Sequence, residues 1–174
     1  KYHKVTKEVA AGRADFGTAG ADILSARDKG APLVIVSSVF QRSPVAFYAR
    51  EETRLRSPAD LTRLRVGTRP NGIAGVELRA MLRAESIDPG LVPQRPIKGK
   101  LGIHDIAARH LDVASGFTIS AGWYARELGL SLTSLSPQTY GVDFYGSALF
   151  TNQRWVSEKP ELVQKFAAAS MKGW

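Results

Sequence analysis

The sequence contains no cysteine among its 174 residues. Disulfide bonds, thiolate metal sites and a cysteine nucleophile are therefore excluded within it. It also lacks any apolar run near the roughly 18 residues that a membrane-spanning helix needs. There is no G-x-S-x-G motif, no histidine pair at metal-binding spacing and no pair of carboxylates placed for acid/base chemistry. We therefore expect no metal, no cofactor and no catalytic residues.

Positive charge is in excess, but it is dispersed along the chain. There are 24 Lys and Arg against 16 Asp and Glu, which gives a net charge of +8 and favours anionic ligands or acidic partners. The densest basic stretch, residues 50–69, is interrupted by Glu51, Glu52 and Asp60. Nucleic-acid binders usually gather basic residues on one face with stacking aromatics. We therefore expect no nucleic-acid partner.

What is present is a short pattern that occurs twice. Residues 10–19 read AAGRADFGTA and residues 107–116 read AARHLDVASG. Each copy predicts the end of a helix, a tight turn, a short buried strand and a small polar tip. Two such copies predict two similar α/β lobes. Ligands of open α/β sheets bind beyond the carboxyl ends of the strands, so both tips are expected to line one cleft.

The alternation of strand-like and helix-like segments predicts largely parallel sheets covered by helices. Residues 33–40 read as a strand buried on both faces. Residues 57–64 read as a short helix with Ser57 as N-cap. Residues 76–87 read as an amphipathic helix, and residues 160–174 as a terminal helix. The residues expected to face inward are Leu78, Met81 and Leu82 in the first of these helices, and Leu162, Val163, Phe166 and Ala167 in the second.

Two extended runs flank the middle of the chain, SPVAFYAR before it and GVDFYGSALFT after it. One lobe inserted into another requires two such crossings. The domain prediction follows as lobe one in residues 1–43 and 147–174, lobe two in 51–140, and hinge crossings in 44–50 and 141–146.

The loop GTRPNGIAG, residues 67–75, joins a strand to a helix. It is no nucleotide-hydrolysing phosphate loop, because Ile73 stands where that motif requires Lys. Backbone N–H groups at such a helix start can hold a polar ligand group, although a plain turn is the alternative. Gln41 is a further polar candidate, with a solvated loop residue as its alternative. Tyr140, Phe144 and Tyr145 either stack on a ligand or fill the core, which is the favoured interpretation.

Three phrases carry a family resemblance: FQRSP at residues 40–44, SPADLTRLRVG at 57–67, and YGVDFYG with PELVQKF towards the carboxyl end. With them the whole chain resembles the solute-binding proteins of ABC transporters. The branch is the one related to thiamine-pyrimidine-precursor binding, beside the nitrate, sulfonate and taurine binders. The resemblance implies an α/β type II periplasmic binding protein with two Rossmann-like lobes joined by a two-strand hinge. It also implies that lobe one is incomplete here.

The resemblance implies a small polar, anionic or heteroaromatic solute, an ABC permease as partner, a monomer and a periplasmic or extracytoplasmic location. A fungal thiamine-pyrimidine synthase of the same fold is the enzymatic alternative, but it depends on a cysteine-rich iron motif that this chain lacks. Regulators of the same fold carry a helix-turn-helix, which is not visible here. The ligand contacts implied are Thr18, Ala19, Ser38, Gln41, Thr68, Asn71, Gly72, Gly116, Phe117, Asp143 and Tyr145.

Overall fold

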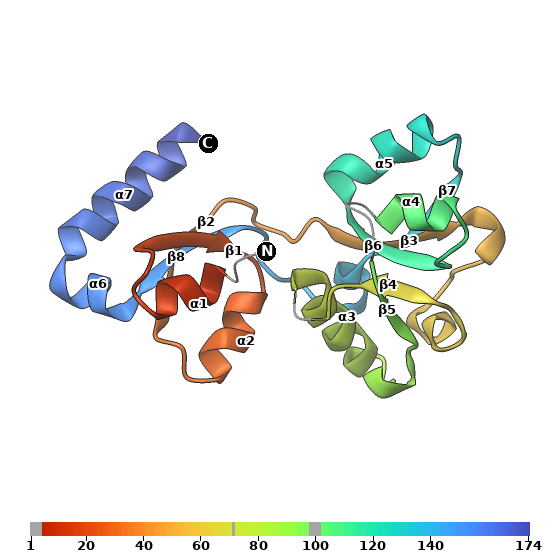
Figure 1. Ribbon diagram of the computed structural model, residues 1–174, viewed down its shortest axis with the longest axis horizontal. Coiled ribbons are helices and arrows are strands. Elements are labelled where there is room, and N and C mark those ends of the chain that lie inside the picture. The colour runs from red at the N-terminus through yellow and green to blue at the C-terminus, as the bar shows by residue number, and fades with distance from the viewer. Residues whose placement is uncertain (1–4, 71, 98–101) are drawn as a thin grey trace. The chain divides into compact units, whose positions relative to one another are not determined.

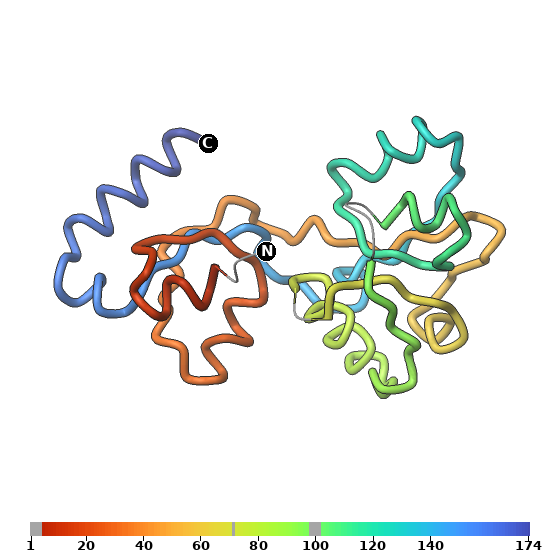
Figure 2. The backbone as a smooth tube through the Cα atoms, viewed as in Figure 1, coloured from red at the N-terminus to blue at the C-terminus, as the bar shows by residue number. Residues whose placement is uncertain are grey.

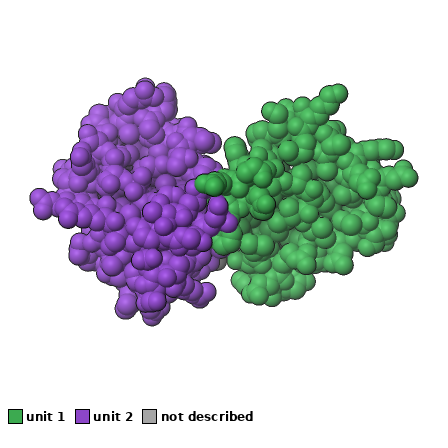
Figure 3. Space-filling model, turned by 180° about the vertical axis from the view of Figure 1, so that it is seen from behind, with its two compact units in different colours: residues 1–43, 144–174 green, residues 44–143 purple. Residues whose placement is uncertain are grey.

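A computed structural model describes residues 5–70, 72–97 and 102–174. The chain divides into two compact units, unit 1 with residues 1–43 and 144–174, and unit 2 with residues 44–143 (Figure 3). The backbone therefore passes from one unit to the other twice (Figure 2). Within the described parts of the chain, every helix is too short or too polar to span a bilayer.

Unit 1 is built on a three-stranded sheet with strand order β1-β8-β2. Its strands are β1 (Phe16–Ala19), β2 (Leu33–Ser38) and β8 (Ala148–Asn152), and β8 is antiparallel to both neighbours. The helices are α1 (Val5–Ala10), α2 (Asp22–Asp28), α6 (Gln153–Glu158) and α7 (Pro160–Gly173) (Figure 1). The prediction of a largely parallel sheet is wrong for this unit, because its central strand arrives from the other end of the chain.

The core of unit 1 lies on the face of the sheet covered by α1 and α2. Val9, Ile23, Leu33 and Phe150 are completely buried there. Strand β2, however, lies at one end of the described sheet, and its Ile35 is 41% exposed. The prediction that this strand is buried on both faces is therefore wrong.

Helix α7 is only partly packed. Val163 is buried as predicted, but Leu162 and Phe166 are 44% and 41% exposed, so the prediction that they face inward is wrong. Phe166 does stack on Phe16, with ring centroids 4.0 Å apart. This contact covers one side of the ring and leaves the rest accessible.

Unit 2 holds a five-stranded sheet in the order β5-β4-β6-β3-β7. Strand β4 is parallel to β5 and β6, whereas β3 is antiparallel to β6 and β7, so the sheet is mixed rather than largely parallel. The bounds are β3 (Val45–Arg50), β4 (Val66–Thr68), β5 (Gln94–Pro96), β6 (Val113–Phe117), β7 (Leu132–Leu135), α3 (Ile73–Ala84), α4 (Gly102–Ala107) and α5 (Thr118–Glu127).

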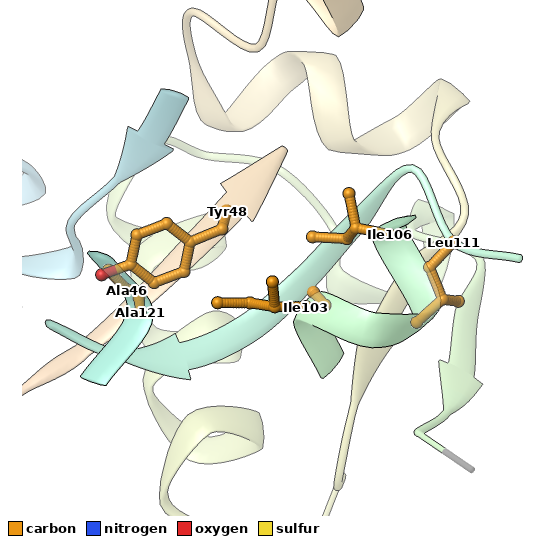
Figure 4. Packing of buried hydrophobic residues seen from close by; sticks show 7 residues of the cluster. Ala46, Tyr48, Ile103, Ile106, Leu111 and Ala121 are labelled. Atoms are coloured by element: carbon orange, nitrogen blue, oxygen red, sulfur yellow. The ribbon is translucent and has the colours of Figure 1, made fainter. Parts of the chain in front are cut away.

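Helices cover both faces of this sheet (Figure 1). Leu78, Met81 and Leu82 of α3 are fully buried, which confirms the predicted amphipathic helix. The other face packs against α4 and α5. Figure 4 shows that cluster, in which Tyr48 of β3 lies among apolar side chains; its members are Ala46, Tyr48, Ile103, Ile106, Leu111, Ala114 and Ala121. Residues 58–63 form a 3₁₀ rather than an α-helix, with the predicted Ser57 in a capping box.

The repeated pattern forms the same local structure in both units. Helix α1 ends at Ala10 and α4 at Ala107, which are equivalent positions of the two copies. The next equivalent pair, Gly12 and Arg109, both adopt a left-handed backbone, with φ of 71° and 57°. A strand and a helix then follow in each unit. The prediction of a helix end, a tight turn and a short strand is thereby confirmed, but the prediction that the strand is buried is wrong for β1, which is partly exposed along its length.

Candidate functional site

A cavity of about 220 Å³ lies within unit 2, where strands β4 and β6 end. Because these two strands are adjacent and parallel, their carboxyl ends meet at one edge of the sheet. Strand β6 passes directly into α5, and β4 is joined by a short loop to α3. Two helix N-termini are thus brought to the same cavity.

The lining is mostly small or apolar, with a few polar side chains between. Arg69 is the one charged side chain among the described lining residues, and no carboxylate is among them. The aromatic rings are those of Phe117 and Tyr124. The complete lining is Arg69, Gly72, Ile73, Ala74, Ile97, Gly102, Ile103, Ser115, Gly116, Phe117, Ser120, Ala121 and Tyr124.

Glycines allow the elements around the cavity to pack closely. A Cβ atom on Gly116 would lie 3.3 Å from the ring of Tyr48, and one on Gly102 would lie 2.6 Å from Cβ of Ala114. On Gly75 it would collide with the carbonyl oxygens of Arg69 and Pro70. The loop before α3 is therefore folded directly against the first turn of that helix.

At neither helix start beside the cavity does the N-cap residue make a side-chain capping hydrogen bond. The N-cap positions are Gly72 for α3 and Phe117 for α5, and neither side chain can accept a hydrogen bond. At the start of α5 the N–H of Thr118 donates to the carbonyl oxygen of Pro44, 2.8 Å away. The first turn of a helix has N–H groups without intrahelical partners and carries a partial positive charge. This edge of the cavity is suited to hydrogen-bond acceptors and to anions.

The polar side chains at the cavity include two serines. Ser115 and Ser120 supply hydroxyl groups, and Ser120 Oγ donates weakly to the carbonyl oxygen of Phe117 at 3.4 Å. Among the described lining residues no histidine or carboxylate accompanies these serines as a base. The arrangement can hold a small solute by its polar groups and by contact with aromatic rings.

The predicted site residues of unit 2 fall in different places. Gly72, Gly116 and Phe117 line the cavity. Thr68 does not: it is fully buried at the end of β4, and its Oγ1 has no hydrogen-bond partner in the described part of the chain. Asn71 lies outside the described residues. A ligand contact by any of these residues stays a prediction.

Most of the other predicted residues belong to unit 1. Thr18 and Ala19 end β1, and Ser38 ends β2. Ser38 Oγ donates to the carbonyl oxygen of Phe40 at 3.0 Å, and Gln41 Nε2 donates to that of Ser38 at 3.3 Å, so Ser38 and Gln41 share one turn.

The return crossing carries the last two predicted residues. Asp143 is an exposed residue at the end of unit 2, and Tyr145 of unit 1 is 60% exposed. Within unit 1 the segments next to the crossings are hydrogen-bonded to each other, since the N–H of Ser43 donates to the carbonyl oxygen of Phe144 and that of Gly146 to the carbonyl oxygen of Phe40. The roles of Asp143 and Tyr145 as ligand contacts stay predictions.

Several cavity residues were missed from the sequence. Ser120, Ala121 and Tyr124 are spaced so that they share one face of a helix, a signal that was available once the helix start was placed. Ser115 belongs to the repeated pattern but was left out of the predicted contacts. Ile97 and Ile103 carry no local signal, because the pairing of β5 with β4 brings Ile97 to the cavity and the packing of α4 on the sheet brings Ile103 there.

Comparison with known proteins now adds to this geometry. A sequence profile described as NMT1/THI5 like matches residues 1–174. The chain belongs to the NMT1/THI5-like family. Its relatives include the riboflavin-binding protein RibY of Chloroflexus aurantiacus, 29% identical over 90% of this chain and 44% of that protein. Another is the formylaminopyrimidine-binding protein of Halalkalibacterium halodurans, 31% identical over 88% of this chain and 47% of that protein.

Solved structures agree with the family on the fold. The alkanesulfonate-binding protein SsuA from Xanthomonas axonopodis pv. citri, bound to MOPS, has a TM-score of 0.71 at 21% identity, over 94% of this chain and 56% of that one. The periplasmic aliphatic sulphonate binding protein SsuA from Escherichia coli has a TM-score of 0.73 at 16% identity, over 93% and 55%. This family member thus has the α/β fold of periplasmic binding proteins, as predicted, and spans about half the length of the relatives that it matches.

Proposed function

We propose that this chain is the solute-binding component of an ABC importer, acting outside the cytoplasm as a monomer and delivering its solute to a membrane permease. The observation that carries the proposal is the cavity of unit 2, where two uncapped helix N-termini meet and no carboxylate is among the described lining residues. Membership of the NMT1/THI5-like family and relatives named as binding proteins support it.

The cavity favours a small solute with hydrogen-bond acceptors. Its volume of about 220 Å³ is below the roughly 300–1,000 Å³ typical of sites for drug-sized ligands. The helix starts and Arg69 attract acceptor oxygens, ring nitrogens or an anionic group. Phe117 and Tyr124 can contact a flat ring. We therefore infer a heteroaromatic or anionic solute, such as a thiamine-type pyrimidine or a sulfonate, and not a cation.

Unit 1 supplies the second part of the proposed site. Thr18, Ala19 and Ser38 stand at the ends of β1 and β2, with Gln41 in the turn after β2, as Gly116 and Phe117 stand at the end of β6. Residues 44–50 and 141–146 then act as the hinge by which the lobes close on the solute. A ligand drives such closure only if it binds the closed state better than the open one.

No catalysis is part of the proposal. The thiamine-pyrimidine synthase of this fold needs a cysteine-rich motif, and this chain has no cysteine. The serines at the cavity have no neighbouring base among its described lining residues. Binding of the solute without its chemical change is therefore expected.

The experiment is a calorimetric titration with formylaminopyrimidine, riboflavin, MOPS and, as a cationic control, arginine. Native mass spectrometry of protein purified without refolding weighs any solute that co-purifies. Saturable binding of an acceptor-rich solute, with arginine inert, supports the proposal. Tight binding of arginine, or conversion of a bound pyrimidine to a product, contradicts it.

A further inference from the structure

A second cavity of unit 2, called the basic cavity below, has three arginines in its lining. Its volume is about 350 Å³, and the guanidinium groups of Arg65, Arg95 and Arg109 line it together with the imidazole of His110. Asp105 is the one carboxylate among its described lining residues. We propose that this cavity binds a phosphate group, as the free ion or as a phosphate monoester.

The basic cavity is distinct from the first cavity of unit 2, although Pro96 of its lining is followed directly by Ile97 of the other. Arg65 comes directly before β4, and His110 belongs to the turn that precedes β6. The basic cavity is therefore near the amino ends of two strands whose carboxyl ends carry the solute cavity. The two cavities share no lining residue. The proposal thus stands independently of the proposed solute binding.

Two of the three guanidinium groups are held by carboxylates to different extents. Arg65 is fixed, because its Nε and Nη2 donate to the two oxygens of Asp112 at 2.9 and 2.6 Å. Arg109 is held loosely, with Nη2 3.4 Å from Oε1 of Glu52 and a side chain that is 73% exposed. The side chain of Arg65 is therefore held in one orientation at the cavity, whereas that of Arg109 can turn towards a ligand.

Arg95 is the arginine of the cavity without a carboxylate partner among the described residues. No ion pair involves it in the described part of the chain, although it lies close enough to Asp112 to contribute to lowering the pKa of that carboxyl. It stands on edge strand β5, beside Gly67 of β4. An arginine without a carboxylate partner in a concave site is available to an incoming anion.

Asp105 is the described lining carboxylate whose charge opposes an anion. Its side chain is 12% exposed, and its Oδ1 lies 3.8 Å from Nδ1 of His110. Its Oδ2 is buried without a hydrogen-bond partner in the described residues, so it is directed away from solvent. Among the described lining residues three guanidinium groups thus stand against one carboxylate, since Asp112 and Glu52, which pair with Arg65 and Arg109, do not line the cavity.

The geometry of guanidinium selects the kind of anion. Its planar fork donates two parallel hydrogen bonds and matches oxyanions with several oxygens, such as phosphate, better than halides. A phosphate dianion also compensates more of the charge than a monoanion. The site is open to solvent, so binding is expected to weaken as salt is added.

The test is a titration of the purified chain with inorganic phosphate at constant ionic strength, followed by calorimetry. Arg95→Gln is compared with Arg126→Gln, which removes the same charge from an exposed arginine on α5, outside both cavities. We expect Arg95→Gln to weaken phosphate binding about tenfold or more. Arg126→Gln should stay within about twofold of the wild type.

A second experiment distinguishes a lipid phosphate group from a soluble one. Vesicles of phosphatidylcholine with and without phosphatidic acid are sedimented with the chain, in the presence and absence of inorganic phosphate. Binding to phosphatidic acid that depends on Arg95 and is displaced by phosphate assigns the cavity to a lipid phosphomonoester. Phosphate binding without sedimentation assigns it to a soluble one.

Three results would overturn the proposal. The first is the absence of saturable phosphate binding. The second is an equal loss in both arginine variants, which would mean that the overall charge attracts phosphate. The third is vesicle binding that inorganic phosphate does not displace. None of these results bears on solute binding, which is read from the separate titration described above.

Discussion

The guanidinium of Arg65 and the carboxylate of Asp112 join the starts of two neighbouring strands. Besides the two side-chain hydrogen bonds, Oδ2 of Asp112 accepts the backbone N–H of Arg65 at 2.8 Å. The backbone N–H of Asp112 in turn donates to the carbonyl oxygen of Arg65 at 3.1 Å. These contacts align β4 with β6, and so they position the strand ends that form the solute cavity.

This pair gives a prediction on pH and stability. The hydrogen bonds from Arg65 lower the pKa of Asp112, against an opposing effect of burial. A lowered folded-state pKa means that the contribution is fully present above the unfolded value of about 3.9 and is lost as the pH falls through the folded value. Asp112→Asn should cost about 1–2 kcal/mol of unfolding free energy at neutral pH, since the pair is partly screened by solvent. The difference from the wild type should shrink in strong acid.

Urea unfolding of the wild type and of Asp112→Asn, at neutral and at acid pH, measures the stability cost of the substitution at each pH. Glu158→Gln is the control, because its ion pair with Arg154 lies on an exposed helix surface and should contribute less than about 0.5 kcal/mol. A cost of Asp112→Asn that is the same at both pH values would argue against the ion pair.

Two glycines in helices should respond oppositely to alanine. A Cβ atom on Gly75 meets the carbonyl oxygens of Arg69 and Pro70, whereas one on Gly122 of α5 has no atom within 4 Å. Gly75→Ala should therefore destabilise the chain by about 1–3 kcal/mol, because the loop must shift. Gly122→Ala should stabilise it by about 0.5–1 kcal/mol through helix propensity. Thermal unfolding of the two variants measures these changes. Equal changes in stability would mean that the loop before α3 moves aside for the added Cβ atom at no cost.

Asn152 connects two helices of unit 1. Its Nδ2 donates to the carbonyl oxygens of Val9 and Ala10 at 3.2 and 3.1 Å, and its Oδ1 accepts the N–H of Arg154 at 3.0 Å. Asn152→Asp keeps the acceptor but loses the donors, so it should cost about 1–3 kcal/mol. The neighbouring exposed Gln153→Ala should change stability by less than about 0.5 kcal/mol. If chemical unfolding gives the same stability for Asn152→Asp as for the wild type, the two hydrogen bonds donated by Nδ2 contribute nothing to stability.

The proposed hinge predicts a change in dimensions on binding. If residues 44–50 and 141–146 bend as the lobes close, saturating solute should lower the radius of gyration. Small-angle scattering with and without the solute measures it, with arginine as the ligand that should leave the curve unchanged. Identical curves at proven saturation would mean that binding does not require closure.

The sequence predicted the local structure of the chain better than its long-range pairing. The strand tips before Gly72 and at Phe117 follow from glycine, proline and the repeated pattern, but α3 begins at Ile73, three residues before the predicted start at residue 76. The antiparallel sheet of unit 1 does not, because it depends on contacts such as Thr151 Oγ1 donating to the carbonyl oxygen of Asp15, 136 residues away. Likewise Ile97 reaches the cavity through the pairing of β5 with β4, and Ile103 through the packing of α4, and no local pattern encodes either contact.

Exposure was harder to predict than element type. Leu162 and Phe166 have the spacing of a buried helix face, yet they remain accessible in α7 because the described chain places little against them. Thr68 ends a strand as expected, but the alternation of β4 turns its side chain away from the cavity.

The central claim is that solute binds in the cavity of unit 2 at the starts of α3 and α5, and Gly72→Val tests it most directly. An added Cβ on Gly72 has its nearest neighbours at 3.4 and 3.6 Å, so valine fits without unfolding and occupies part of the cavity. Each variant is titrated by calorimetry with whichever solute of the proposed titration the wild type binds most tightly. Gly122→Val is the matched control. We predict that Gly72→Val weakens binding by about 1–3 kcal/mol, roughly 5- to 150-fold, at an unchanged melting temperature. Equal affinities for Gly72→Val, Gly122→Val and the wild type would contradict the assignment of the cavity.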